Sequence, residues 1–74
     1  MALRHPDSSA LIQIAEDRLR SRLDTAVSNL SCDYADGVLC LRGHSRTFYD
    51  KQTAQEAVRH VEGVSQIVNR IKVA

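Results

Sequence analysis

The stretch Tyr34-Ala35-Asp36-Gly37-Val38-Leu39-Cys40-Leu41-Arg42-Gly43, residues 34–43, decides the fold of this chain. Asp-Gly pairs suit the two-residue turns of β-hairpins, because both turn residues can adopt the positive φ that such turns require. Apolar and polar residues alternate over 30–35, as they do in a half-buried strand. The sequence therefore predicts one strand over 30–35 and a return strand over 38–42 that stops at Gly43.

The two-residue turn also fixes which side chains share a face of this hairpin. It places Ala35 opposite Val38, and every other pair follows by counting outward. Tyr34 then faces Leu39, and Cys32 faces Leu41, on the side predicted to be buried. Cys40 falls opposite Asp33 on the other side. The two cysteines therefore point to opposite faces of the sheet and are predicted to form no disulfide.

Helical periodicity flanks the hairpin on both sides. Apolar residues recur at spacings of three and four from Leu11 to Val27, which predicts a helix over 9–27. A second helix is predicted over 47–61, with Thr47 as its N-cap and Gly63 in the left-handed position after its end. Phe48 and Tyr49 are expected to pack at the edge of the fold. β-branched residues then predict a last strand over 64–73.

The order of these elements predicts the α+β class, as a two-layer αββαβ sandwich. Two helices cover one face of a three-stranded mixed sheet, and the other face stays open. Residues 1–8 are predicted to be an N-terminal tail and residues 9–74 a single domain. The predicted core is aliphatic and comprises Leu19, Leu23, Leu39, Leu41, Ala57, Val58, Val61, Ile67 and Ile71.

Composition narrows the classes of function. The chain has 74 residues, no Trp and a net charge of +1. A core this small supplies only about 3–5 kcal/mol of stability, so a buried catalytic cleft is disfavoured. The low net charge disfavours nucleic acid as a partner. No clustered spacing of Cys or His predicts a metal site. We therefore expect a non-catalytic binding module without cofactor, metal or catalytic residues.

The motifs of this chain resemble those of the BON domain family over about Ile12 to Val73. The resemblance begins with the DG turn and the hydrophobic strand that ends in Gly43. An alanine-rich helix follows, and then the segments Val61-Glu62-Gly63-Val64 and Val68-Asn69-Arg70-Ile71-Lys72-Val73. The family fold is an αββαβ sandwich with a mixed sheet, which agrees with the order of elements predicted above. The resemblance implies a bacterial, non-enzymatic protein linked to stress response, with phospholipid binding or protein interaction as its role.

The open sheet face carries the candidate binding site. Strand parity places Val38, Cys40 and Arg42 of the return strand on this face, with Val68, Arg70 and Lys72 of the last strand. An apolar strip thus borders three cations. We name Val38, Arg42, Val68, Arg70 and Lys72 as the candidate site.

Two functions suit such a surface. The first is peripheral attachment to an anionic phospholipid membrane. The second is protein–protein interaction, which includes weak homo-oligomerisation through the same face. Met1 to Ser9 has none of the apolar stretch of a secretory signal. The sequence as it stands therefore predicts a cytoplasmic protein, and a periplasmic or envelope-associated one if an export signal precedes it.

Overall fold

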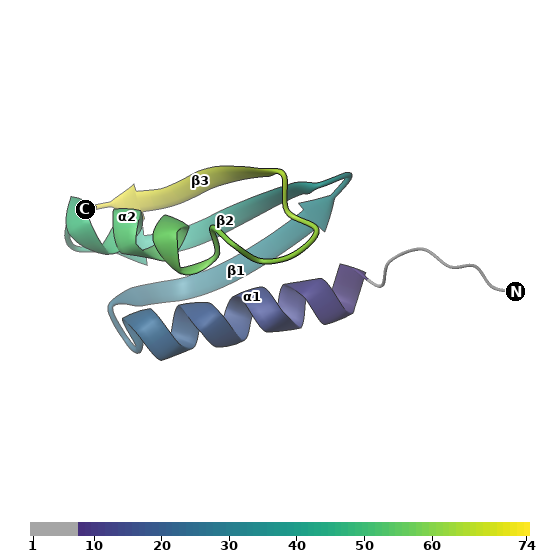
Figure 1. Cartoon of the computed structure of the whole chain (residues 1–74). Coiled ribbons are helices and arrows are strands. Elements are labelled where there is room, and N and C mark those ends of the chain that lie inside the picture. The colour runs from purple at the N-terminus through teal and green to yellow at the C-terminus, as the bar shows by residue number, and fades with distance from the viewer. Residues whose placement is uncertain (1–7) are drawn as a thin grey trace, which may run out of the picture.

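The fold is an α+β sandwich with the predicted order of elements. The computed structural model describes residues 8–74, and most of the predicted tail over 1–8 therefore lies outside the described residues. The elements are α1 (Ser8–Leu23), β1 (Val27–Ala35), β2 (Val38–Ser45), α2 (Phe48–Ala57) and β3 (Gln66–Val73). The strands form one sheet in the order β1-β2-β3. Both helices lie on one face of this sheet (Figure 1), which confirms the predicted fold class.

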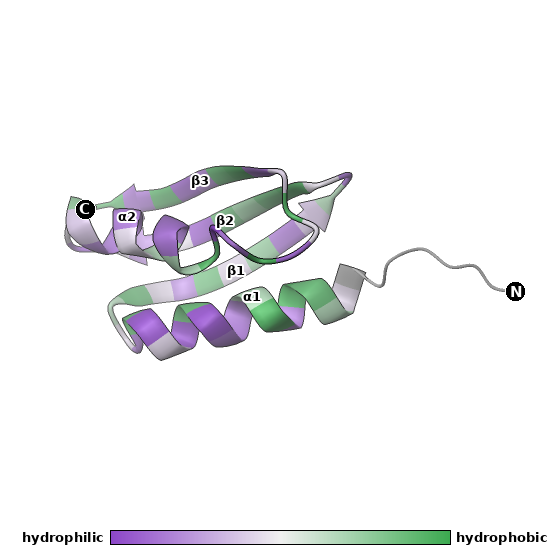
Figure 2. Cartoon of the chain, viewed as in Figure 1, coloured by the Kyte–Doolittle hydropathy of each residue, from purple (hydrophilic) through white to green (hydrophobic). Residues whose placement is uncertain are grey.

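The Asp-Gly turn sets the register of the hairpin as predicted. Asp36 and Gly37 both have positive φ, 51° and 83°. β1 and β2 are antiparallel, and the register places Tyr34 opposite Leu39 and Cys32 opposite Leu41. β2 and β3 are parallel. Figure 2 shows hydrophobic and hydrophilic residues alternating along β1, whereas the first half of β2, Val38 to Leu41, is hydrophobic throughout.

Several predicted boundaries are wrong. α1 ends at Leu23 rather than at Val27, because Asp24 turns the chain with φ 51° and Val27 then begins β1. α2 ends at Ala57 rather than at residue 61. β3 begins at Gln66 rather than at residue 64. β1 begins three residues earlier than predicted, at Val27 instead of residue 30.

β2 does not stop at Gly43 but continues to Ser45. Ser28 pairs with His44 and Ser31 with Arg42, so Asn29 and Leu30 together oppose the single residue Gly43. This is a β-bulge, which bends and twists the strand that carries it. A Cβ on Gly43 would lie 2.9 Å from the carbonyl oxygen of Ser28. Gly43 is therefore required by the bulge of β1 and not by the end of a strand.

The core lies between the sheet and the two helices. Eight of the nine predicted core residues are buried, and the ninth, Ile67, is partly buried against them. Val58 and Val61 are buried although they follow the end of α2, because the turns after α2 keep these two side chains against the core. The core also takes in Ala15, Val27, Cys32 and Ala54.

Two side chains of the sheet form hydrogen bonds to α2 and to the segment that follows it. The Tyr34 hydroxyl donates a 2.6 Å hydrogen bond to the carbonyl oxygen of Gly63, after α2. Asn69 of β3 donates a 2.8 Å hydrogen bond to the carbonyl oxygen of Lys51, and its side-chain oxygen accepts from the Ile71 amide at 3.2 Å. Asn69 thereby anchors α2 to the outer strand of the sheet.

Candidate functional site

On β2 and β3, the open sheet face carries four rows of side chains. The parallel register pairs Val38 with Gln66, Cys40 with Val68, Arg42 with Arg70, and His44 with Lys72. The residues between them, such as Leu39, Leu41 and Ile71, point to the helices and are buried. All five residues of the candidate site therefore lie on the predicted face.

These rows divide the open face into two halves. Val38, Cys40 and Val68 are half-buried and form an apolar half at the end nearer the hairpin turn. Arg42, Arg70, His44 and Lys72 are exposed and form a basic half at the other end. Val38 and Lys72 lie six register positions apart, on the order of 20 Å. The five candidate residues therefore share a face without forming one compact patch.

Arg42 has a partner on the neighbouring strand. Its guanidinium nitrogen Nη1 lies 2.9 Å from Oδ2 of Asp33 in β1. Both side chains are well exposed, so the pair contributes little to stability. The pair does change the charge of the face, because Asp33 offsets the positive charge of Arg42, which is the neighbour of Arg70.

Arg70 and Lys72 form no ion pair within residues 8–74. Both are exposed. The net positive charge of the open face is therefore concentrated on these two side chains at the carboxyl end of β3.

Three further cations lie at the same end of the molecule, and sequence reasoning missed them as part of a site. Arg22 is in the last turn of α1, Arg46 follows β2, and Lys51 is in the first turns of α2. None forms an ion pair in the described part of the chain. We call Arg22, Arg46, Lys51, Arg70 and Lys72 the basic end. Asp24 follows Arg22 by two residues, and Asp50 directly precedes Lys51.

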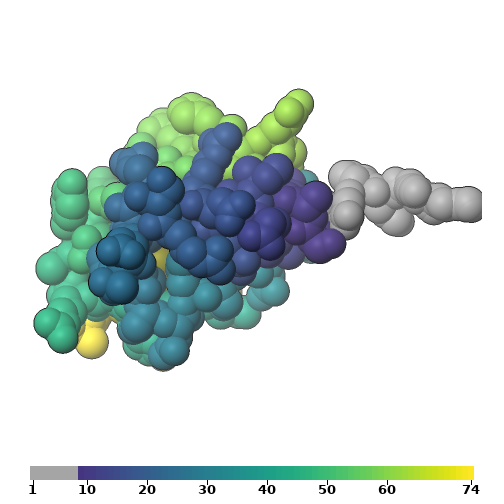
Figure 3. Space-filling view, turned by 90° about the horizontal axis from the view of Figure 1, so that it is seen from below, coloured from purple at the N-terminus to yellow at the C-terminus, as the bar shows by residue number. Residues whose placement is uncertain are grey.

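The topology brings these five cations to one end of the molecule, because α1, β2 and β3 all end near the start of α2. In Figure 1 the C-terminus lies beside the first turn of α2. An open depression there is lined by Ser28, His44, Arg46, Asp50 and Ala74, among others. In Figure 3 the green atoms that follow β2 project at the left beyond the blue end of α1. The one feature of the sequence that could have indicated this site is that these cations lie near the ends of predicted elements.

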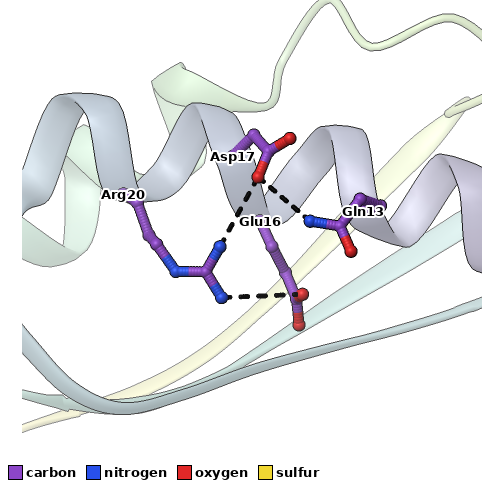
Figure 4. A network of polar contacts seen from close by, with 4 residues as sticks. All are labelled: Gln13, Glu16, Asp17 and Arg20. Carbon is purple, nitrogen blue, oxygen red and sulfur yellow. Dashed lines mark hydrogen bonds and ion pairs between the residues drawn. The ribbon is translucent and has the colours of Figure 1, made fainter.

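Arg20 is not counted in the basic end, because its guanidinium forms ion pairs within α1. Its guanidinium lies 3.5 Å from Asp17 and 4.0 Å from Glu16, and Gln13 donates a 3.0 Å hydrogen bond to Asp17 (Figure 4). These contacts lie on the exposed side of α1, and each joins residues three or four positions apart, about one turn of the helix. The second half of α1 thus carries charges of both signs.

Two aromatic side chains are exposed at the basic end. Phe48 is 66% exposed and Tyr49 is 75% exposed. The expectation that they pack at the edge of the fold is wrong. Thr47 caps α2 by accepting the Asp50 amide at 3.1 Å, and Ala54 and Ala57 are its buried contacts with the core. The first turn of α2 therefore presents its two aromatic side chains to solvent.

The cysteines lie on opposite faces and are both free, as predicted. Burial raises the pKa of the Cys32 thiol to about 11, and the nearby carboxylates of Glu16 and Asp33 act in the same direction. A thiol with a raised pKa is a poor nucleophile at neutral pH. Cys40 is half-buried on the apolar half of the open face. Residues 8–74 contain no group of three or more His, Cys, Asp or Glu side chains placed to hold a metal ion.

Comparison with known proteins identifies the family. A sequence model described as BON domain matches residues 11–74, which is most of the chain. The chain therefore belongs to the BON domain family. No curated protein matches the sequence. Within the described residues, no helix is both long enough and apolar enough to cross a membrane.

Proposed function

We propose that this BON domain is a non-catalytic module that attaches peripherally to anionic phospholipid membranes through its basic end. The observation that carries the proposal is the gathering of five cations, which form no ion pair within residues 8–74, where the sheet and both helices meet. The family supports it, since phospholipid or membrane binding is the role attributed to BON domains. The same resemblance extends the proposal to a role in bacterial stress response.

The charge distribution sets the expected strength of attachment. A basic side chain close to an anionic membrane contributes on the order of 1 kcal/mol. Arg70 and Lys72 contribute from the open face, whereas Asp33 offsets much of what Arg42 would add. Few charges give weak and reversible binding. Such binding weakens as salt rises, because exposed charges are screened.

A non-catalytic role is supported by two observations. BON domains are generally binding modules without catalysis. Burial raises the pKa of the Cys32 thiol, and this shift makes the thiol less reactive. Catalytic nucleophiles and bases need the opposite, a pKa brought toward the working pH.

Sedimentation with lipid vesicles tests the proposal. The native protein should sediment with phosphatidylglycerol-containing vesicles and remain in the supernatant with phosphatidylcholine vesicles. The attachment should fade between 0.1 M and 1 M salt, as the screening length falls from about 10 Å to about 3 Å. Equal sedimentation with both vesicle types, or with neither, would rule out attachment through the basic end.

A second candidate function rests on the apolar half of the open face. No helix of the described chain covers Val38, Cys40 and Val68, which lie in adjacent positions across β2 and β3. A protein partner or a second copy of the chain could bury these side chains. Val38→Lys together with Val68→Lys should then shift the monomer–oligomer equilibrium, measured by analytical ultracentrifugation. A native protein that stays monomeric at high concentration would exclude self-association.

A further inference from the structure

The exposure of Phe48 and Tyr49 is not required by the fold. The chain contains three aromatic residues. The third, Tyr34, is half-buried and hydrogen-bonded to Gly63. Phe48 and Tyr49 instead occupy the first two positions of α2 and lie 66% and 75% exposed. Aromatic side chains gain much from burial, so two adjacent exposed ones suggest a surface that buries them in a complex.

Each aromatic side chain stands beside a cation of the basic end. Tyr49 and Arg22 line one open depression, which lies between α1 and α2. Phe48 and Lys51 line a second one, on the side of β3. Arg46 lies two residues before Phe48, the first residue of the helix. The two aromatic rings are therefore bordered by Arg22, Arg46 and Lys51, which form no ion pair within residues 8–74.

The nearby acids only partly compensate these cations. Glu56 lines both depressions, and its carboxylate lies 3.3 Å from the Arg59 guanidinium. Asp50 lies in the first turn of α2, where the helix dipole stabilises a negative charge. Asp24 begins the turn after α1. Three cations against Asp24 and Asp50 leave this surface positive, and Lys72 on the neighbouring strand adds to it.

From this juxtaposition we infer that Phe48 and Tyr49 insert into the interfacial layer of an anionic bilayer, while Arg22, Arg46 and Lys51 contact lipid phosphates. The inference rests on the proposed function and specifies which part of the molecule enters the membrane. Tyrosine suits the membrane–water interface because its ring is apolar and its hydroxyl is polar. Phenylalanine is typical of the apolar side of interfacial helices.

The inference fixes an orientation of the domain. The first turn of α2 faces the bilayer, and the carboxyl ends of β2 and β3 lie close to it. The apolar half of the open face, some 20 Å away along β2, then stays in water. A membrane that bound the apolar half of the open face would instead cover Val38 and leave Tyr49 exposed.

Single tryptophan reporters distinguish these orientations, because the native chain has no Trp. Tyr49→Trp and Val38→Trp would each be mixed with phosphatidylglycerol-containing vesicles, with and without brominated acyl chains. We expect a blue shift and bromine quenching for Tyr49→Trp and an unchanged emission for Val38→Trp. Quenching of Val38→Trp alone would overturn the inference and place the sheet face on the membrane.

A binding measurement separates failure of the inference from failure of the proposed function. Phe48→Ser with Tyr49→Ser should weaken vesicle binding by about tenfold or more, a change that corresponds to about 1.4 kcal/mol. Ile14→Ser, which removes a 48% exposed apolar side chain from the middle of α1, should leave binding unchanged.

Circular dichroism would confirm that both variants fold. If the native protein and the Phe48→Ser/Tyr49→Ser variant bind equally, insertion is excluded and attachment by charge remains. If the native protein does not bind the vesicles at all, the proposed function itself is wrong. Loss of binding in all variants, Ile14→Ser included, would contradict a specific role of the two aromatic residues.

Discussion

The Arg42 guanidinium lies 2.9 Å from the carboxylate of Asp33 on the adjacent strand, and this pair marks where the basic end begins. Arg42 and Arg70 are direct neighbours across β2 and β3. Asp33 offsets the charge of one of these two arginines. The remaining positive charge of the open face therefore lies toward Lys72 and the first turn of α2.

Removal of this carboxylate should strengthen membrane attachment. Asp33→Asn releases Arg42, and one more available cation should raise the affinity for anionic vesicles about fivefold at low salt, from about 1 kcal/mol per basic residue. Asp36→Asn is the matched control, since it removes the same charge at the hairpin turn, where Asn tolerates the positive φ. An equal gain in both variants would mean that only net charge matters.

The core of the sandwich depends on Leu41, which is fully buried between the sheet and the helices. Leu41→Ala should lower the free energy of unfolding by roughly 2–5 kcal/mol, as large-to-small changes in cores do. In so small a domain this can abolish folding. Val73→Ala, at a 43% exposed position of β3, should change it by less than about 0.5 kcal/mol. Urea denaturation measures both, and an undisturbed Leu41→Ala variant would contradict the register of β2.

Asn69 should be the strongest polar contribution to the docking of α2. Asn69→Ala removes its hydrogen bonds to Lys51 and Ile71 and leaves the Lys51 carbonyl without its side-chain donor. We expect a loss of about 1–3 kcal/mol in the free energy of unfolding. Gln55→Ala removes only the 3.3 Å contact with Asn69 and should cost much less. Similar losses in the two variants would show that the amide network, not the Lys51 anchor, holds the helix.

The two thiols should differ in reactivity. At pH 8, iodoacetamide should modify Cys40 on the open face and leave Cys32 intact, because burial raises the pKa of Cys32 to about 11. Mass spectrometry should find one adduct on the native protein and two on the denatured one. Two adducts on the native protein would contradict the buried position of Cys32.

The raised pKa of Cys32 makes the free energy of unfolding depend on pH. The unfolded chain loses the Cys32 proton near its ordinary pKa of 9.0, whereas the folded chain retains it to about 11. Between these values the unfolded state binds fewer protons, so the free energy of unfolding falls as pH rises. The stability due to the neutral thiol is fully present below pH 9. Thermal melts of the native protein and of Cys32→Ala across this range would reveal the difference.

The hairpin could be predicted from local chemistry, and the ends of the helices could not. Asp36-Gly37 specifies a two-residue turn, and the parity of every residue on β2 follows from it. Val27 continues the spacing of Leu19 and Leu23, so periodicity alone extends α1 too far. The turn at Asp24 ends the helix before Val27 is reached. Val27 is nevertheless buried, because it begins β1 and points into the core from there, so its burial does not require a helix.

The candidate site shows the same division between local and tertiary information. Strand parity placed Val38, Arg42, Val68, Arg70 and Lys72 on one face. It placed Asp33 on the same face but did not predict its ion pair with Arg42, and it gave no information on the cations of α1 and α2 that lie beyond the sheet. Those contacts depend on which ends of the elements meet in space, and a single sequence does not specify this.

The most direct test of the account is the affinity of Lys72→Glu for phosphatidylglycerol-containing vesicles at low salt. Lys72 is exposed and without an ion pair in the described chain, and its reversal changes the charge at the basic end by two units. At about 1 kcal/mol per charge, binding should fall on the order of 30-fold. Arg59→Glu makes the same change in charge after α2, beyond the last turn of the helix, and should reduce binding less than Lys72→Glu does. Equal affinities of Lys72→Glu and the native protein would contradict attachment through the basic end.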